Sequence, residues 1–418
     1  MIEIGDTMIK AILLGAGNRG EHAYGYYAQI HPNEIKFVGV AEQNEIRLES
    51  FSKKHNIPKE NQYKDYKDIL NKPKMADACF ICLQDKMHYE PALKAIELGY
   101  DVFLEKPMAI SAKEVIEIYA YAKKYKKNVM VGHVLRYTDF FNTIKSIIDS
   151  GEIGDIMTIQ HNENVSYWHQ AHSYVRGNWR NVLVASPMIL AKSCHDMDIL
   201  SWLINSKPTK VASFGDLSHF RKETMKDVPD YCMAGCQHQN TCPYFAPKVY
   251  LNAPDWMKYP VSDDLSDDAV LRALEHGPYG KCVYRCDNDV VDHQVVSIEF
   301  ENKVTASFTM TAFTHENTRT IKVMGTKGEI RGHMDKNEIE IYTFGQDLPK
   351  HLKLNESEYG HGGGDHGIMS SFVKLINENR FDQSSLEISI QAHLLAFMAE
   401  TSRIEERVIH FDDFVKKQ

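Results

Sequence analysis

Residues 8–20 read MIKAILLGAGNRG, an apolar run that ends in glycines at fixed spacing. The run has the length of a buried strand, and residues 21–30 can continue as a helix, so the stretch predicts a strand, a glycine turn and a helix. Gly15, Gly17 and Gly20 fit the pattern G-x-G-x-x-G in the context that gives the pattern its meaning. We therefore expect this stretch to open a βαβ unit of a parallel sheet.

The alternation of strands and helices continues through the first third of the chain. Further strands are predicted at residues 35–41, 78–83, 101–104 and 128–131, with helical stretches at residues 44–55 and 88–99. Ser111 and Glu114 form a capping-box pattern that starts another helix. The prediction is an α/β fold in which residues 1–133 form a doubly wound parallel Rossmann sheet.

From residue 134 onward, strands follow one another without a helix between each pair. Strands are predicted at residues 157–165, 294–300, 304–313 and 320–324, and helices at residues 139–150, 187–204, 367–379 and 386–406. This pattern predicts that residues 134–418 form an α+β domain with a largely antiparallel, open sheet. A polar, cysteine-bearing stretch at about residues 215–289 is interpreted as an insertion into this domain.

The composition narrows the class of protein. The 418 residues are 43% hydrophobic and 25% charged, with 57 acidic against 48 basic residues and a formal net charge of −9. This balance argues against a nucleic-acid partner. No apolar run approaches the roughly 18 residues of a membrane span, and the opening MIEIGDTMIK lacks the pattern of an export signal. Eight cysteines are too few for a disulfide scaffold. We expect a cytoplasmic protein without a membrane partner.

The glycine turn carries the first functional expectation. In such a turn Gly15 permits the tight bend, Gly17 lets the backbone approach a pyrophosphate, and Gly20 allows the helix to pack on the strand. Glu42 ends the second predicted strand, where a carboxylate accepts hydrogen bonds from a ribose 2′-hydroxyl and repels a 2′-phosphate. Since the nearest basic residue, Arg47, falls in a helix, NAD is favoured and NADP stays open.

Several motifs, in order along the chain, resemble one known family. Glu105-Lys106-Pro107 follows the strand at residues 101–104, after the helical stretch 88–99, and is followed by residues 132–137, His195-Asp196-Met-Asp198 and residues 325–329. Together with the glycine turn, these strings resemble the glucose-fructose oxidoreductase and inositol dehydrogenase family over most of the chain. The resemblance implies an NAD-dependent dehydrogenase that acts on a sugar, a polyol or a related cyclic alcohol.

The resemblance also implies catalytic roles. Lys106 corresponds to the family lysine that lies beside the nicotinamide and the substrate hydroxyl, before a proline that is often cis. His195 would be the general base in oxidation. Many relatives carry an aspartate where this chain has Ala191, so Lys192, three residues before His195 on the predicted helix, is expected to share the proton handling. A solvated surface lysine and a core histidine are the plainer alternatives.

The remaining site residues fall into two groups. The cofactor is expected to contact Gly15, Gly17, Asn18, Arg19, Gly20, Glu42, Gln84, His88, Glu105 and Lys106, although relatives often have proline at the position of Gln84. Flat rings that cover C–H patches and multi-donor side chains that bond hydroxyls suit a carbohydrate. The substrate is therefore expected to contact Arg136, Tyr137, Trp168, His169, His172, Arg176, Trp179 and His195. The alternative for the aromatic group is an interface between subunits. Asp365 is placed either to cap a helix or to contact substrate, and capping is the simpler role.

Five cysteines crowd into the predicted insertion, in the patterns C-x3-C-x5-C and C-x3-C. Cys232, Cys236, Cys242, Cys282 and Cys286 could hold a structural zinc ion or an iron–sulfur cluster. The alternative is a small satellite core of free cysteines.

Two other functions compete with net oxidation. The altered Ala191 and Lys192 pair keeps open an NAD-dependent glycosidase that works by transient oxidation, and some relatives are silent proteins that only sense NAD or a sugar. The open sheet of the second domain leaves a face that needs cover, so we expect a homo-oligomer, a dimer or a tetramer.

Overall fold

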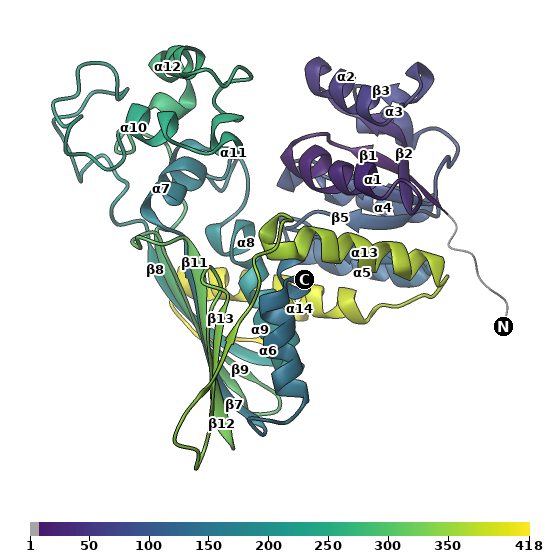
Figure 1. Ribbon diagram of the computed structural model, residues 1–418, viewed down its shortest axis with the longest axis vertical. Helices are drawn as coiled ribbons and strands as arrows, with labels where there is room; N and C mark the ends of the chain where they lie inside the picture. Colours follow the sequence, from purple (N-terminus) through teal and green to yellow (C-terminus); the bar gives the residue numbers. More distant parts are fainter. Residues whose placement is uncertain (1–7) are drawn as a thin grey trace.

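The computed structural model describes residues 8–418, which form two β-sheets (Figure 1). Most of the opening stretch used above to argue against an export signal lies outside the described residues. The first sheet has six parallel strands in the order β3-β2-β1-β4-β5-β6. Their bounds are β1 Ile9–Leu14, β2 Ile35–Ala41, β3 Gln62–Tyr63, β4 Ala78–Ile81, β5 Asp101–Leu104 and β6 Val129–Val131. This strand order confirms the predicted doubly wound sheet.

Helices cover both faces of the first sheet. They are the π-helical η1 (Asn18–Gly25) and then α1 (Tyr26–Ile30), α2 (Glu45–Lys54), α3 (Tyr66–Leu70), α4 (Tyr89–Glu97) and α5 (Ala112–Tyr125). One covering helix, α13 (Gly364–Asn377), comes from the far end of the chain (Figure 1). Phe372 on α13 packs edge-on against Phe80 and Phe103 of the sheet. The layer around the first sheet is thus completed by residues far beyond 133.

The second sheet has nine strands in the order β14-β13-β12-β11-β7-β10-β9-β8-β15. Only β7 (Ile156–Asn164) and β10 (Thr305–Thr311) pair in parallel. The other strands are β8 Pro208–Asp216, β9 His293–Phe300, β11 Thr318–Gly325, β12 Gly328–His333, β13 Glu338–Thr343, β14 Lys350–Lys353 and β15 Ile409–His410. The sheet is therefore mostly antiparallel, as predicted.

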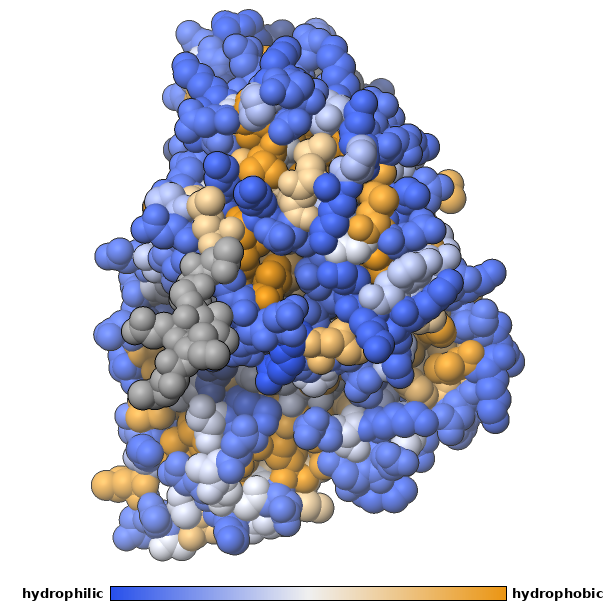
Figure 2. Space-filling view, turned by 90° about the vertical axis from the view of Figure 1, so that its right-hand side faces the viewer, coloured by the Kyte–Doolittle hydropathy of each residue, from blue (hydrophilic) through white to orange (hydrophobic). Residues whose placement is uncertain are grey.

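One face of the second sheet is covered by helices. The covering helices α6 (Asp139–Asp149), α9 (Cys194–Ile204) and α14 (Ser384–Glu405) lie together on one side of the strands in Figure 1. Buried and more exposed residues alternate along β9 and β10, which is the pattern of a sheet packed on one face. Among the described residues, no helix has the length and apolar character of a membrane span. The side of the molecule in Figure 2 is largely hydrophilic, with its apolar residues in separate groups.

The single helix predicted over residues 187–204 is wrong. The chain forms α8 (Met188–Ala191), breaks at Lys192 and Ser193, and resumes as α9 (Cys194–Ile204). In a continuous helix the Ala191 carbonyl would accept a hydrogen bond from the amide of His195. Here that carbonyl accepts instead from the Lys106 ammonium at 2.8 Å. Lys192 ends the first helix, so it does not share a helical face with His195.

A long excursion joins β8 to β9, although these two strands pair with each other. It contains α10 (Ala246–Leu251), α11 (Asp255–Lys258), α12 (Asp267–His276) and the short η6 (Pro278–Gly280). Its residues build two small hydrophobic clusters with the segment α7 (Tyr167–His169) and η5 (Gln170–Arg176). The excursion, with its own small clusters, sits above α7 in Figure 1.

Candidate active site

The glycine turn has the geometry of a close backbone approach. Gly15 has φ +92°, and a Cβ there would lie 2.5 Å from the carbonyl oxygen of Cys82. A Cβ at Gly20 would lie 2.2 Å from the Gly15 carbonyl oxygen. At Gly17, in contrast, an added Cβ would meet no atom within 4 Å. Protein atoms therefore crowd the two outer glycines and leave the middle one facing open space.

Glu42 closes the turn from the end of β2. Its carboxylate accepts hydrogen bonds from the Ala16 amide at 2.7 Å and from the Asn44 amide at 2.9 Å. The residue is half-buried, and Arg47, the nearest basic side chain in sequence, is exposed on α2. Each carboxylate oxygen accepts one bond here and has a second lone pair for a ligand hydroxyl.

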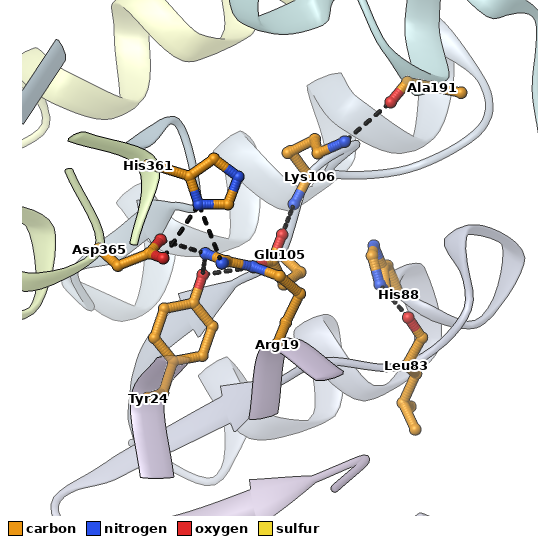
Figure 3. A network of polar contacts seen from close by, with 9 residues as sticks. All are labelled: Arg19, Tyr24, Leu83, His88, Glu105, Lys106, Ala191, His361 and Asp365. Atoms are coloured by element: carbon orange, nitrogen blue, oxygen red, sulfur yellow. Dashed lines mark hydrogen bonds and ion pairs between the residues drawn. The ribbon is translucent and has the colours of Figure 1, made fainter. Parts of the chain in front are cut away.

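Arg19, which lies within the turn, joins its own helix η1 to two distant segments (Figure 3). Its guanidinium donates to Glu105 at 2.7 Å, to the Tyr24 hydroxyl at 2.7 Å and to Asp365 at 2.8 Å. Asp365 also pairs with His361 at 2.9 Å, and α13 has no side-chain cap, so the predicted capping role of Asp365 is wrong. Burial alone would raise the pKa of Glu105, but Arg19 and the Tyr24 hydrogen bond outweigh burial and lower it.

Lys106 stands at the carboxyl end of β5, before a cis peptide bond to Pro107. Its backbone amide donates to Glu105 at 3.0 Å, and its ammonium donates to the Ala191 carbonyl at 2.8 Å (Figure 3). The ammonium therefore reaches from the first sheet to the break between α8 and α9. One N–H is used there, and two remain for other partners.

His195 lies in the first turn of α9, next to this break. It is almost fully buried, and its Nδ1 has no hydrogen-bond partner. Burial lowers the pKa of His195 well below its usual value, and Lys106 is the charge that lowers it most. The ring of His133 lies 5.7 Å from that of His195, and His133 Nδ1 pairs with Asp198 at 2.6 Å. The structure thus brings Lys106 close to the buried ring of His195.

Lys192 lies on the other side of the break, in a cluster of buried charges. Its ammonium is 3.5 Å from the carboxylate of Glu163. Burial lowers the pKa of Lys192, Glu163 opposes this effect, and the positive charges of Arg319 and Lys106 add to it. Arg319 pairs with both Glu163 and Asp196.

Sequence reasoning missed Glu163 and Arg319. The available signal was weak: Glu163 stands in the predicted strand 157–165 with a spacing of two from His161, which is also buried. A charged residue on the inner face of a strand needs a buried partner. The sequence does not say which of the many basic residues supplies that partner.

Three of the predicted substrate residues contact loops around the two sheets or the excursion. Trp179 donates from Nε1 to Asp85, which follows β4, at 3.4 Å. His169 contacts Asn317 at 3.0 Å. Burial lowers the pKa of His169, and the positive charge of Lys192 lowers it further. Trp168 stacks on His169 with ring centroids 5.5 Å apart and lines a cavity of about 430 Å³ beneath the excursion.

Other predicted contact residues are engaged inside the protein. The Arg136 guanidinium pairs with Asp198, and Tyr137 packs beneath Gly367 of α13. The His172 ring contacts the Tyr250 hydroxyl, and Arg176 donates to backbone carbonyls of the excursion. The buried ring of His88 bridges the carbonyl oxygens of Pro107 at 2.7 Å and Leu83 at 3.0 Å. These five side chains hold the site's surroundings together, whereas Gln84 is exposed.

All eight cysteines are free. Within residues 8–418, the one set of three ligand-type side chains with atoms inside 4.8 Å of one another is His133, Cys194 and His393. His393 accepts from the Met108 amide at 2.9 Å and donates to the Ser389 carbonyl at 2.7 Å, so neither of its nitrogens is free to bind a metal. The five cysteines of the excursion form no such compact set.

Comparison with known proteins agrees with this geometry. Two family models match the chain, the NAD-binding Rossmann fold of an oxidoreductase family over residues 9–133 and the C-terminal alpha/beta domain of that family over residues 145–407. A Bacillus subtilis protein named as an oxidoreductase, YteT, is 22% identical over 71% of this chain and 72% of its own length. An inositol 2-dehydrogenase/D-chiro-inositol 3-dehydrogenase of Lactiplantibacillus plantarum is 28% identical over 36% of this chain and 40% of its own length.

A solved structure of levoglucosan dehydrogenase with NADH and levoglucosan covers 96% of this chain and 99% of its own length, with a TM-score of 0.71 and 18% identity. At that identity, the match shows the shared fold. The two family models together account for nearly the whole chain. This chain belongs to the glucose-fructose oxidoreductase and inositol dehydrogenase family of NAD-binding oxidoreductases.

Proposed function

We propose that this protein is an NAD-dependent dehydrogenase that moves a hydride between the carbinol carbon of a sugar, polyol or cyclic alcohol and the nicotinamide ring. One observation carries the proposal: the Lys106 ammonium bonds the backbone at the break that precedes the helix of His195. Oxidation of a carbinol removes the hydroxyl proton together with a hydride. It is therefore favoured by a base that takes this proton and by a cation that stabilises the oxygen, both beside the same carbon. In this proposal residues 1–133 bind the cofactor and residues 134–418 bind the substrate.

The residues of the glycine turn fit a dinucleotide. The open space at Gly17 admits a pyrophosphate against the backbone, and η1 begins directly after Gly17, so its N-terminal amide groups are proposed to face the phosphates. We propose that the free lone pairs of Glu42 accept hydrogen bonds from a ribose hydroxyl, which favours NAD over NADP. When bound, NAD supplies the ring carbon that exchanges the hydride.

In this mechanism His195 takes the hydroxyl proton. Burial and the nearby Lys106 keep the imidazole neutral, and a neutral imidazole is the form that acts as a base. Since Nδ1 is enclosed in protein, Nε2 is the nitrogen left to face the substrate. Two free N–H groups of Lys106 orient the hydroxyl and stabilise the negative charge that develops on its oxygen. His133, held by Asp198, is proposed to position the His195 ring.

The substrate is proposed to bind between the end of β4 and the α8–α9 break. Trp179 and His169 offer flat faces for C–H patches, and Lys192 offers a cation for hydroxyls. The inositol and levoglucosan dehydrogenases among the similar proteins act on cyclic polyhydroxy compounds by name, which supports this class. Many relatives have an aspartate at the position of Ala191. This chain has no acid there and has the Lys192 ammonium at the next position, so we expect its preferred compound to differ from theirs.

The test is a panel of sugars, polyols and glycosides, assayed with NAD by NADH absorbance and by product analysis. Lys106→Ala and His195→Asn should each lower kcat by about 10²- to 10⁴-fold, while the Kd for NADH stays within a few-fold. Lys113→Ala and His410→Asn are matched controls, because both residues are exposed. Full activity in both active-site variants refutes the mechanism. Glycoside cleavage without NADH accumulation would instead identify the transient-oxidation alternative.

We further propose that the open face of the second sheet is covered by another copy of the chain. Phe214 is 73% exposed, and its cross-strand partner Val295 is 42% exposed. An apolar pair of this kind on an uncovered sheet face suits a subunit interface. Light scattering after size-exclusion chromatography tests this, and a monomer refutes it.

The free cysteines fit the proposed cytoplasmic location, which cell fractionation tests.

A further inference from the structure

Four of the five cysteines of the excursion line one cavity, and the fifth does not. Four of them, Cys232, Cys236, Cys242 and Cys282, line a single narrow internal cavity together with Arg176. The fifth, Cys286, is absent from the wall of that cavity, and its thiol contacts the Cys282 carbonyl at 3.4 Å. The active site proposed above uses none of these residues.

The backbone presents two of the four thiols from one small ladder. Tyr231 and Lys281 form an isolated antiparallel bridge. The Cys232 amide donates to Gly280 at 2.9 Å, and the Cys282 amide donates to Asp230 at 2.9 Å. Residues that are diagonal neighbours across such a bridge project from the same face. Cys232 and Cys282 therefore point to one side, although they lie 50 positions apart in the sequence.

The other two thiols come from the compact turns that follow the bridge. Gly235 adopts φ +77°, which lets the chain bend sharply just before Cys236. The Cys242 amide then donates to His238 at 2.8 Å, which folds the chain back. Local hydrogen bonds hold both cysteines in place and return them to the same cavity.

The same cavity holds a buried cation without a counter-charge. Arg176 is 1% exposed. Its Nε donates to the Lys281 carbonyl and one Nη to the Tyr244 carbonyl, both at 2.7 Å, whereas the other Nη has no partner. Across residues 8–418, no carboxylate lies within ion-pair distance of this guanidinium; its neighbours of weakly acidic character are the Tyr250 hydroxyl and the cysteine thiols, with the Cys232 thiol 3.5 Å from it. A buried, uncompensated charge is costly, so this cavity calls for an anion.

We propose that Cys232, Cys236, Cys242 and Cys282 ligate an iron–sulfur cluster, and that Arg176 balances part of its negative charge. Each thiol loses its proton and donates sulfur to one iron. Four thiolates outweigh the charge of a cubane iron–sulfide core and leave the complex anionic, which meets the need of Arg176.

A single zinc ion fits this arrangement less well. Zinc holds four sulfurs at about 2.3 Å, which places them all within a few ångströms of one another. No three of these thiols lie within 4.8 Å of one another in the described chain. A cubane core binds its cysteines at its corners and so spaces them more widely.

The cluster would act as a structural element of the substrate side. Cys242 lines both this cavity and the 430 Å³ cavity that Trp168 borders. The excursion also reaches the first sheet's helices, because Tyr259 stacks on His22 of η1 with centroids 5.5 Å apart. Joining residues 232–242 to Cys282 at one cluster therefore fixes the wall that faces the Trp168 cavity. No electron transfer to the cofactor is proposed.

The test is iron and acid-labile sulfide analysis of the full chain, purified without oxygen and also reconstituted with ferrous iron and sulfide. About four irons and four sulfides per chain are expected, with broad visible absorption and an electron paramagnetic resonance signal after reduction. Cys232→Ser and Cys282→Ser should lose most of the iron, and Cys286→Ser should keep it.

The outcomes separate the proposal from its alternatives. One zinc per chain without sulfide, or no metal and no sulfide after reconstitution, overturns it. Equal iron in Cys232→Ser and wild type overturns the ligand assignment. If the serine variants are insoluble, the metal content of the wild type and of Cys286→Ser still decides. Iron content is independent of dehydrogenase activity, so this result and the test of the proposed function can fail separately.

Discussion

The most informative single change is at Glu42. Its carboxylate accepts two backbone hydrogen bonds, from the Ala16 and Asn44 amides. Glutamine keeps one acceptor oxygen and removes the charge, so Glu42→Gln should weaken the hydrogen bond to the ribose and relieve the repulsion of a 2′-phosphate. A hydrogen bond to a charged group is worth about 1.5–3 kcal/mol, which corresponds to about a 10- to 100-fold rise in the Kd for NADH.

The gain for NADPH follows from the same charge. Two unit charges about 4 Å apart repel by about 4 kcal/mol at an effective dielectric of about 20, and solvent at this half-buried site reduces that figure. We therefore expect the ratio of the two Kd values to move toward NADPH by at least about 100-fold. Fluorescence titrations with NADH and NADPH at one salt concentration measure this ratio. Glu45→Gln is the control, because Glu45 is exposed and pairs only with Lys64. An unchanged ratio in Glu42→Gln refutes the role of Glu42.

Three further predictions follow from the buried charges. In the wild type, kcat/KM should decline on the acid side below pH 6.5, because burial and Lys106 lower the pKa of His195. His195→Gln should abolish this decline. Profiles of kcat/KM against pH for both proteins measure it. Asp198→Asn should lower the free energy of unfolding by about 3–5 kcal/mol, read from urea titrations, since it leaves Arg136 buried and unpaired. In the wild type, the pKa of Asp198 is about 2 against a usual 3.8, which contributes about 2 kcal/mol of stability above pH 4 or so. That contribution should disappear as the pH falls from about 4 toward 2, and it should be missing from the acid unfolding curve of Asp198→Asn.

The first sheet could be predicted from the sequence because its signals are local. Apolar runs bounded by glycines and polar helices predicted five of its six strands. Ser111 caps α5 by accepting a hydrogen bond from the Glu114 amide, as its pattern predicted. The two-residue β3 carries no apolar run and escaped notice. In the second sheet, β8, β12, β13, β14 and β15 were missed, since very short strands and strands with many polar residues on their open face resemble polar loops.

The errors at the site come from long-range contacts. The apolar sequence around Lys192 predicts a continuous helix, but the chain breaks at Lys192 and Ser193, and the Ala191 carbonyl bonds the ammonium of Lys106, 85 residues away. Arg136 and Arg176 have the composition of ligand-binding residues, yet their partners, Asp198 and the carbonyls of the excursion, lie 62 and 68 or more residues away. A side chain's type indicates which bonds it can make, but only the fold determines whether a partner inside the protein takes them first.

The network around Arg19 explains how the two halves of the site act together. Arg19 lies within the glycine turn, where the cofactor is proposed to bind, and it pairs with Glu105. Glu105 in turn accepts the backbone amide of Lys106 through its other oxygen. Asp365, at the start of the helix that returns to the first sheet, completes the network. Because these groups are largely buried, a shift of the guanidinium costs free energy at every partner. The glycine turn and Lys106 therefore share one connection, so in the proposed mechanism a cofactor that orders the turn also orders the ammonium proposed to meet the substrate.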